Sequence, residues 1–87
     1  MIEVQLELKN GDGLHARPAG IIAKAASQFQ AKVEVSAKGQ SKNAKSVMSL
    51  LTLGLERGDA FALRADGPDE EAAVNHLKSV IESQLEV

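Results

Sequence analysis

The sequence contains no cysteine, tryptophan or tyrosine, and its only phenylalanines are Phe29 and Phe61. The absence of cysteine excludes disulfides, thiolate nucleophiles and sulfur-ligated zinc sites, and it is typical of an intracellular protein. Two phenylalanines offer little surface on which RNA bases could stack. The formal net charge of −2 gives the chain as a whole no attraction to nucleic acid. We therefore expect no nucleic-acid partner.

Long apolar runs are also absent. No segment approaches the roughly 18 apolar residues of a membrane-spanning helix, and the chain opens with alternating polar and apolar residues rather than with a basic and then apolar leader. We expect a soluble, cytoplasmic protein with no membrane insertion. His15 and His76 belong to different predicted elements and have no recognisable companion ligands, so we expect neither a metal nor a cofactor. His76 falls off the apolar stripe of its predicted helix and is expected to be exposed.

The length of 87 residues suits one domain, 1–87, with no room for a separate substrate lobe. Such a chain can offset its conformational entropy by burying one two-layer core. A pocket that buries a whole metabolite would be difficult to fit into it. The size therefore excludes most multi-domain enzyme architectures.

Three segments, 2–9, 32–37 and 61–66, alternate polar and apolar residues, which is the pattern of strands with one buried face. A fourth strand, 40–44, is predicted as the return strand of a hairpin after the turn at 38–40. The segment 40–44 is the most polar of the four, which favours the edge of a sheet. Turn chemistry separates the segments at Asn10-Gly11-Asp12-Gly13, Lys38-Gly39-Gln40 and Gly67-Pro68.

Three segments have helical spacing. The first begins near Ala16, where Pro18 is tolerated in the first turn, and its apolar face consists of Ala19, Ile22, Ala26 and Phe29. The second is short, is capped by Ser46 and ends at Gly54 or Gly58; its apolar residues are Val47, Met48, Leu50, Leu51 and Leu53.

The third helix follows Asp69, Glu70 and Glu71, whose charges suit the positive end of a helix. Its predicted core face consists of Ala73, Val74, Leu77, Val80 and Ile81. The element order is then β-α-β-β-α-β-α. This order predicts an α+β fold, an open-faced β-sandwich in which three helices cover one face of a four-stranded, mainly antiparallel sheet.

His15 stands directly before the first helix, after a glycine-rich turn, and is followed by Arg17. The first amide hydrogens of a helix have no internal partner and carry a partial positive charge, so this end can bind an anion. Arg17 adds a planar set of donors that matches phosphate oxygens. The same positive field disfavours a charged imidazole, which helps to keep His15 nucleophilic near neutral pH.

These residues by themselves allow two interpretations. His15 could receive a phosphoryl group on a ring nitrogen, because a neutral imidazole beside an anion site suits covalent phosphoryl transfer. It could equally cap the helix while Arg17 is only a solvated charge. Residue types alone leave both open.

Residues 13–19 read Gly13-Leu14-His15-Ala16-Arg17-Pro18-Ala19. This segment resembles the active-centre motif of the HPr family, the histidine-containing phosphocarriers of the bacterial phosphoenolpyruvate:sugar phosphotransferase system. The family's regulatory-serine segment is similar to Asn43-Ala44-Lys45-Ser46-Val47-Met48 with Leu53-Gly54, and its last turn to Gly67-Pro68-Asp69-Glu70. The likeness spans the whole chain and keeps the order of elements.

The resemblance implies a sheet of order 1-4-2-3 and a carrier without enzymatic turnover. It implies that His15 accepts phosphate at Nδ1 from phosphorylated enzyme I and passes it to enzyme IIA domains for sugar uptake. Ala16 and Arg17 would form the phosphate cradle, with Arg17 stabilising the phosphoryl group. A carrier that exposes its site to successive partners is expected to be a monomer.

The family pattern also implies a docking surface, whose expected members are Gly20, Ile21, Val47, Met48 and Leu51. Lys24 and Lys45 complete the predicted docking surface, because they could meet acidic surfaces of partners. From the residues alone, ordinary core packing is an equal or better explanation of the apolar members, and a solvated face of the lysines.

Ser46 is the residue of a second hypothesis. The resemblance implies phosphorylation by an ATP-dependent HPr kinase/phosphorylase, with the modified form serving a catabolite-control regulator. Ser49 departs from the glycine or lysine of many relatives and Gly20 from the usual alanine, which puts the kinase-regulated role in doubt while leaving carrier chemistry intact. The alternative function is a regulatory HPr-like interaction module, in carbon-catabolite or nitrogen-branch control.

Overall fold

The computed structural model describes residues 1–8 and 16–84. In chain order its elements are β1 Ile2–Glu7, α1 Ala16–Ala26, β2 Lys32–Ala37, β3 Gln40–Asn43, α2 Val47–Leu51, β4 Ala60–Asp66 and α3 Glu70–Gln84. The four strands form one sheet of order β1-β4-β2-β3, with every neighbouring pair antiparallel. The predicted fold class and strand order are confirmed.

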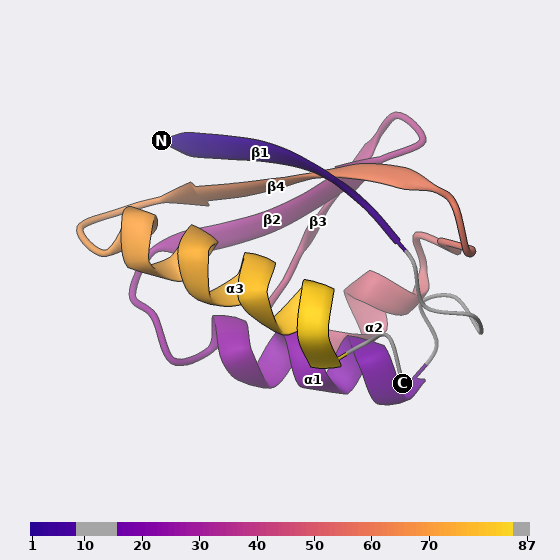
Figure 1. Cartoon of the computed structure of the whole chain (residues 1–87), viewed down its shortest axis with the longest axis horizontal. Helices are drawn as coiled ribbons and strands as arrows, with labels where there is room; N and C mark the ends of the chain where they lie inside the picture. Colours follow the sequence, from indigo (N-terminus) through magenta and orange to yellow (C-terminus); the bar gives the residue numbers. More distant parts are fainter. Residues whose placement is uncertain (9–15, 85–87) are drawn as a thin grey trace.

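All three helices lie on one face of the sheet (Figure 1). The core lies between the two layers, where inward-facing strand residues such as Val33, Val35 and Leu63 meet the buried faces of the helices. Apolar residues at alternate positions build this face because successive side chains of a strand point to opposite sides. The five residues predicted as the core face of α3 are all buried.

The outer face of the sheet is polar. Arg64 of β4 donates to the Glu3 carboxylate of the paired strand β1, and Glu34 of β2 stands across from Arg64 on the other side. The polar strand β3 pairs only with β2 and forms one edge of the sheet, as its composition predicted. No helix within residues 1–8 and 16–84 is long and apolar enough to cross a membrane.

Two predicted helix ends were wrong. The first helix ends at Ala26, so Phe29 follows it in a turn, half-buried. The Ser27 hydroxyl donates to the Ala23 carbonyl and the Gln28 amide to the Ala25 carbonyl, and these local bonds replace the continuing helical ladder.

The short helix α2 ends at Leu51, before either predicted glycine. The Thr52 hydroxyl donates to the Ser49 carbonyl at 2.6 Å, and the next two amides form tighter bonds to carbonyls three residues back. Gly54 comes after this turn with a φ of +62°, a conformation that glycine adopts without steric cost.

A carboxylate joins the start of α3 to the segment between α1 and β2. Asp69 accepts the amides of Gln30 and Ala31, both at 2.8 Å. The amide of Gln30, and to a smaller extent that of Ala31, lowers the pKa of the Asp69 carboxyl below its ordinary value of 3.8. The positive charge of Lys45 adds a smaller lowering, and partial burial opposes these effects. The ionised form of Asp69 therefore stabilises the fold.

We expect Asp69→Asn to lower the melting temperature at pH 7 by roughly 5–10 °C, since a neutral amide cannot accept both bonds. A carboxyl whose pKa is lower in the folded state contributes its stability above the unfolded pKa and loses it as the pH falls. The difference between variant and wild type should therefore shrink below about pH 4 in thermal melts. The control is Glu71→Gln, at an exposed position in the first turn of α3. An unchanging difference down to pH 2.5 would contradict this role for the charge.

Candidate functional site

The N-terminus of α1 is the described part of the predicted phosphate site. The helix begins at Ala16, as predicted, and Pro18 lies buried in its first turn. His15 and the preceding turn lie outside the described residues, so the position of the imidazole stays a prediction. The helix start directly after His15 is consistent with the predicted anion site.

Arg17 is exposed in the first turn of α1. None of the carboxylates in residues 1–8 and 16–84 forms an ion pair with it. The helix contains no Asp or Glu, and its charged residues are Arg17 and Lys24. This face is therefore locally positive within a chain of net charge −2, which favours the approach of an anionic group.

Most of the residues predicted to dock partners lie on α1 and α2, which contact one another. Met48 is exposed, with 72% of its surface accessible. Ile21, Val47 and Leu51 are half-buried, and their inner surfaces pack against the core. Gly20 is half-exposed and Lys24 is exposed. Together with the apolar residues, Lys24 gives the two helices a mixed apolar and positive surface.

Lys45 is placed differently from the other predicted docking residues. It is half-buried, and its Nζ donates to the Phe29 carbonyl at 2.8 Å, which links the end of β3 to the turn after α1. This contact joins residues that are distant in the sequence, so the position of Lys45 next to Ser46 could not predict it. A docking role for Lys45 stays a prediction.

Ser46 is the N-cap of α2, as predicted. Its backbone is extended, with φ −114° and ψ 117°, and its Oγ accepts the Ser49 amide at 3.3 Å. Ser49 occupies the position at which Glu or Gln would complete a capping box. Because Ser46 is half-exposed and next to Val47 and Met48, a charge added there would lie within the predicted docking surface.

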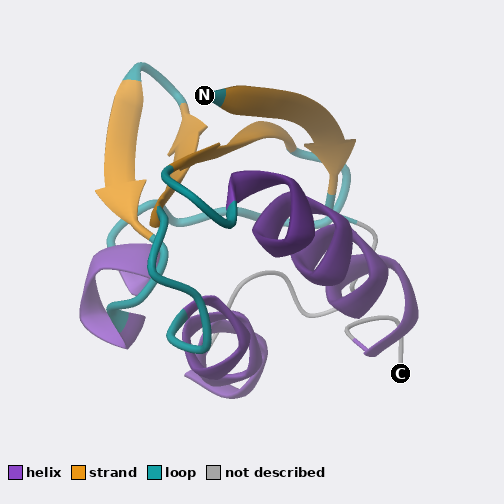
Figure 2. Ribbon diagram, turned by 90° about the vertical axis from the view of Figure 1, so that its left-hand side faces the viewer, coloured by secondary structure: helices purple, strands orange, loops and turns teal. Residues whose placement is uncertain are grey.

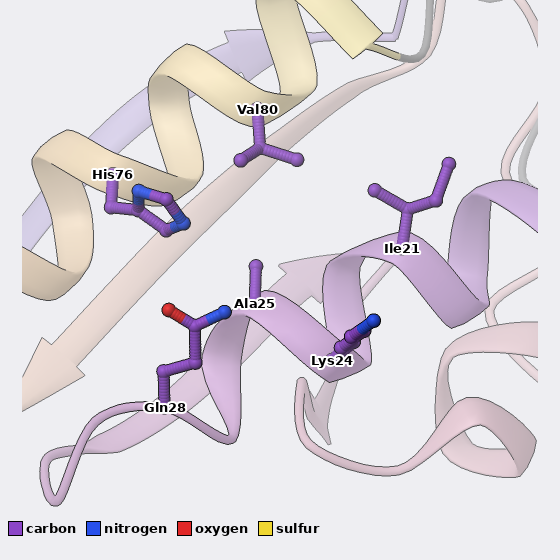
Figure 3. Close-up of a pocket in the computed structure, with 6 residues that line it drawn as sticks. All are labelled: Ile21, Lys24, Ala25, Gln28, His76 and Val80. Carbon is purple, nitrogen blue, oxygen red and sulfur yellow. The ribbon is translucent and has the colours of Figure 1, made fainter.

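An open groove between α1 and α3 lies beside this surface, with a volume of about 350 Å³ (Figure 3). Its lining residues are Ile21, Lys24, Ala25, Gln28, His76 and Val80. The sequence reading assigned Gln28 and His76 no function. The spacing of Ile21, Ala25 and Gln28 could have indicated Gln28, which follows the end of α1 and lines the groove with the other two. No comparable spacing marks His76. His76 is exposed, as predicted.

Residues 2–83 match one protein-family model, that of the PTS HPr component phosphorylation site. The chain belongs to the HPr family. Phosphocarrier protein HPr of Mycoplasma pneumoniae is 41% identical over 83 residues, which cover 94% of each chain. The crystal structure of HPr from Thermoanaerobacter tengcongensis has a TM-score of 0.93 and 42% identity, and the match covers 98% of this chain and 96% of that one.

Family membership confirms the predicted resemblance to the phosphocarriers of the phosphotransferase system. The HPr-like protein Crh of Halalkalibacterium halodurans is also similar, at 36% identity over 97% of this chain and all of its own. Another structure of HPr from T. tengcongensis is of a dimer, with a TM-score of 0.79, 41% identity and full coverage of both chains. The chemistry at the start of α1 is therefore interpreted as that of an HPr-family protein.

Proposed function

We propose that this chain receives a phosphoryl group on His15 from phosphorylated enzyme I and passes it to enzyme IIA domains. The observation that carries the proposal is Arg17: an exposed guanidinium, unpaired with any described carboxylate, in the first turn of a helix that starts right after a histidine in an HPr-family chain. Ala16 and Arg17 would form the phosphate cradle.

The transfer requires no group besides the two proteins. The lone pair of His15 Nδ1 attacks the phosphorus, a P–N bond forms, and the bond from phosphorus to the donor's leaving atom breaks. In the second transfer a nucleophile of the acceptor attacks and the P–N bond of His15 breaks in turn. Arg17 and the amides at the start of α1 would offset the added negative charge at each stage.

The test is to incubate the purified chain with phosphoenolpyruvate and a relative's enzyme I and to map the modified residue by mass spectrometry. We expect one phosphoryl group on His15 that is lost in acid and retained in alkali. Transfer onward is then followed by mixing the phosphorylated chain with an enzyme IIA domain. An acid-stable phosphate, or none, would overturn the proposal.

A regulatory module is the second candidate, favoured by the similarity to Crh and by the half-exposed Ser46. Such a module would be modified on Ser46 by HPr kinase/phosphorylase and would then bind a catabolite-control regulator. A parallel incubation with ATP and an HPr kinase, which should yield acid-stable phosphoserine, tests this role. Both modifications on separate residues would indicate a carrier that is also regulated.

We expect Ser46→Asp to slow phosphoryl acceptance from enzyme I about 10-fold, because the new charge would repel acidic groups of the approaching partner. Its melting temperature should stay close to that of wild type, since aspartate is a good N-cap. Initial rates of acceptance at low ionic strength measure the effect. The matched control is Ser46→Asn, which caps the helix without charge. Equal rates for the two variants would rule out charge repulsion as the cause.

The proposal includes three further properties: residues 1–87 act as one carrier domain, in the cytoplasm and as a monomer. A monomer leaves α1 and α2 accessible to successive partners. Sedimentation at micromolar concentration tests the monomer directly, and a stable dimer would contradict it.

A further inference from the structure

The groove between α1 and α3 combines an apolar floor with a polar rim. Ala25 of α1 and Val80 of α3 are both buried and form the floor, and Ile21 closes one end while remaining half-exposed. In Figure 3, Ala25 and Val80 point toward one another from the two helices. An apolar side chain placed between them would exchange water contact for contact with three aliphatic groups.

The rim carries side chains that can donate hydrogen bonds. Lys24, Gln28 and His76 are all exposed, and in Figure 3 the Gln28 amide and the His76 ring point toward one another. The His76 ring also lies against Phe29, with ring centroids 5.6 Å apart and planes inclined at 55°, which holds the imidazole at the groove. None of the six lining residues is acidic.

A carboxylate fits this rim better than any cation does, because Lys24 supplies a positive charge and no lining residue supplies a negative one. The groove is open along its length, however, and small-molecule sites usually enclose most of their ligand. A segment of a larger protein needs no such enclosure when it is held by contacts elsewhere. Lys24 and Ile21 provide that continuity, because they belong both to the groove and to the predicted docking surface.

We propose that the groove binds an acidic and apolar segment of the phosphoryl-donating partner, with a carboxylate at Lys24, Gln28 and His76 and an apolar side chain over Ala25 and Val80. The inference rests on the proposed function. It adds Gln28 and His76 to the residues that select the partner, on the α3 side of α1, where the family motifs place none.

The decisive variant is the double substitution Gln28→Glu with His76→Glu, which reverses the character of the rim. With a relative's enzyme I as the enzyme and this chain as its substrate, we expect the KM for the chain to rise about 10-fold while kcat changes less than 2-fold. The matched control is Lys78→Glu, exposed on α3 outside the groove, which also lowers the net charge by two. We expect its KM to stay within about 2-fold of wild type.

A variant that is expected to lower the KM separates a binding effect from misfolding, because a misfolded chain would not bind more tightly. Gln28→Lys adds a positive charge to the rim and should lower the KM about 2-fold to 3-fold. Equal effects of the double variant and Lys78→Glu would assign the change to net charge, and would overturn the groove proposal. So would kinetics unchanged in both Gln28 variants.

The two proposals fail in distinguishable ways. If wild type gains no phosphate on His15, the proposed function fails. If wild type is phosphorylated with ordinary kinetics and the rim variants match it, only the groove proposal fails.

Discussion

In the His15→Ala variant we expect no acid-labile phosphate after incubation with phosphoenolpyruvate and enzyme I. Alanine has no nitrogen to form the P–N bond, and Arg17 can hold a phosphoryl group but cannot accept one covalently. His76 cannot substitute, because it lies on α3 against Phe29 rather than at the start of α1. Labelling from radioactive phosphoenolpyruvate, followed by mild acid, measures the loss.

Two comparisons make this result specific to the imidazole. His76→Ala should keep the full stoichiometry of labelling, and both variants should melt at nearly the temperature of wild type. Acid-labile phosphate retained by His15→Ala would refute the assignment of the phosphorylated residue.

The second large effect is expected at Gly67, between β4 and α3. A Cβ built on this glycine would lie 2.6 Å from Ala31 Cα and 3.0 Å from Ala31 Cβ, far inside normal contact. Its φ of +156° is also uncommon for other residues. Because the obstacle is largely backbone, no side-chain rotation can relieve it, and the two segments must separate.

That separation would disturb more than one contact. The amide of Ala31 donates to Asp69, and the amide of Gly67 donates to the Glu70 carboxylate. We therefore expect Gly67→Ala to lower the free energy of unfolding by about 3 kcal/mol, or the melting temperature by roughly 15 °C. Urea and thermal unfolding measure both quantities.

The control for this substitution is Gly20→Ala. A Cβ at Gly20 would have nothing within 4 Å, and the residue is inside α1. The same chemical change should therefore raise the free energy of unfolding by up to about 1 kcal/mol, through helix propensity alone. Should Gly67→Ala unfold at the wild-type urea concentration, the steric account would be wrong.

Features that depend on neighbouring residues could be predicted from the sequence. Alternation located β1, β2 and β4, the turn at Lys38 and Gly39 located the return strand β3, and the polarity of Ser41 and its neighbours placed β3 at the edge. The change of spacing after His15 located the start of α1 at Ala16. Ser46 was recognisable as a cap because a hydroxyl before an apolar run can satisfy an amide of the first turn.

Features that depend on distant segments could not be predicted from the sequence. Asp69 reads as a charge that suits a helix start, yet its carboxylate binds amides 38 and 39 residues away. Lys45 reads as a surface charge, yet its ammonium binds the Phe29 carbonyl. Each contact exists only once the sheet has brought the segments together, and no periodicity records it.

The candidate site divides in the same way. Family motifs predict roles for His15, Arg17 and Ser46, because such motifs are short and continuous. The groove needs Gln28, which follows α1, and His76 of α3 on the same groove, which results only from the packing of the two helices. In Figure 2, α1 lies between α2 and α3, so a partner on the side of α1 that faces away from the sheet can reach either helix.

The polar outer face of the sheet offers a practical handle for spectroscopy. Ser41 on β3 pairs with Ser36 on that face, on the side away from the helices, and it is exposed. A cysteine introduced in its place would be the only thiol in the chain. A fluorophore attached there could report, by energy transfer, the arrival of a labelled protein at the helical layer. The dye itself would lie on the opposite face and would not obstruct that protein.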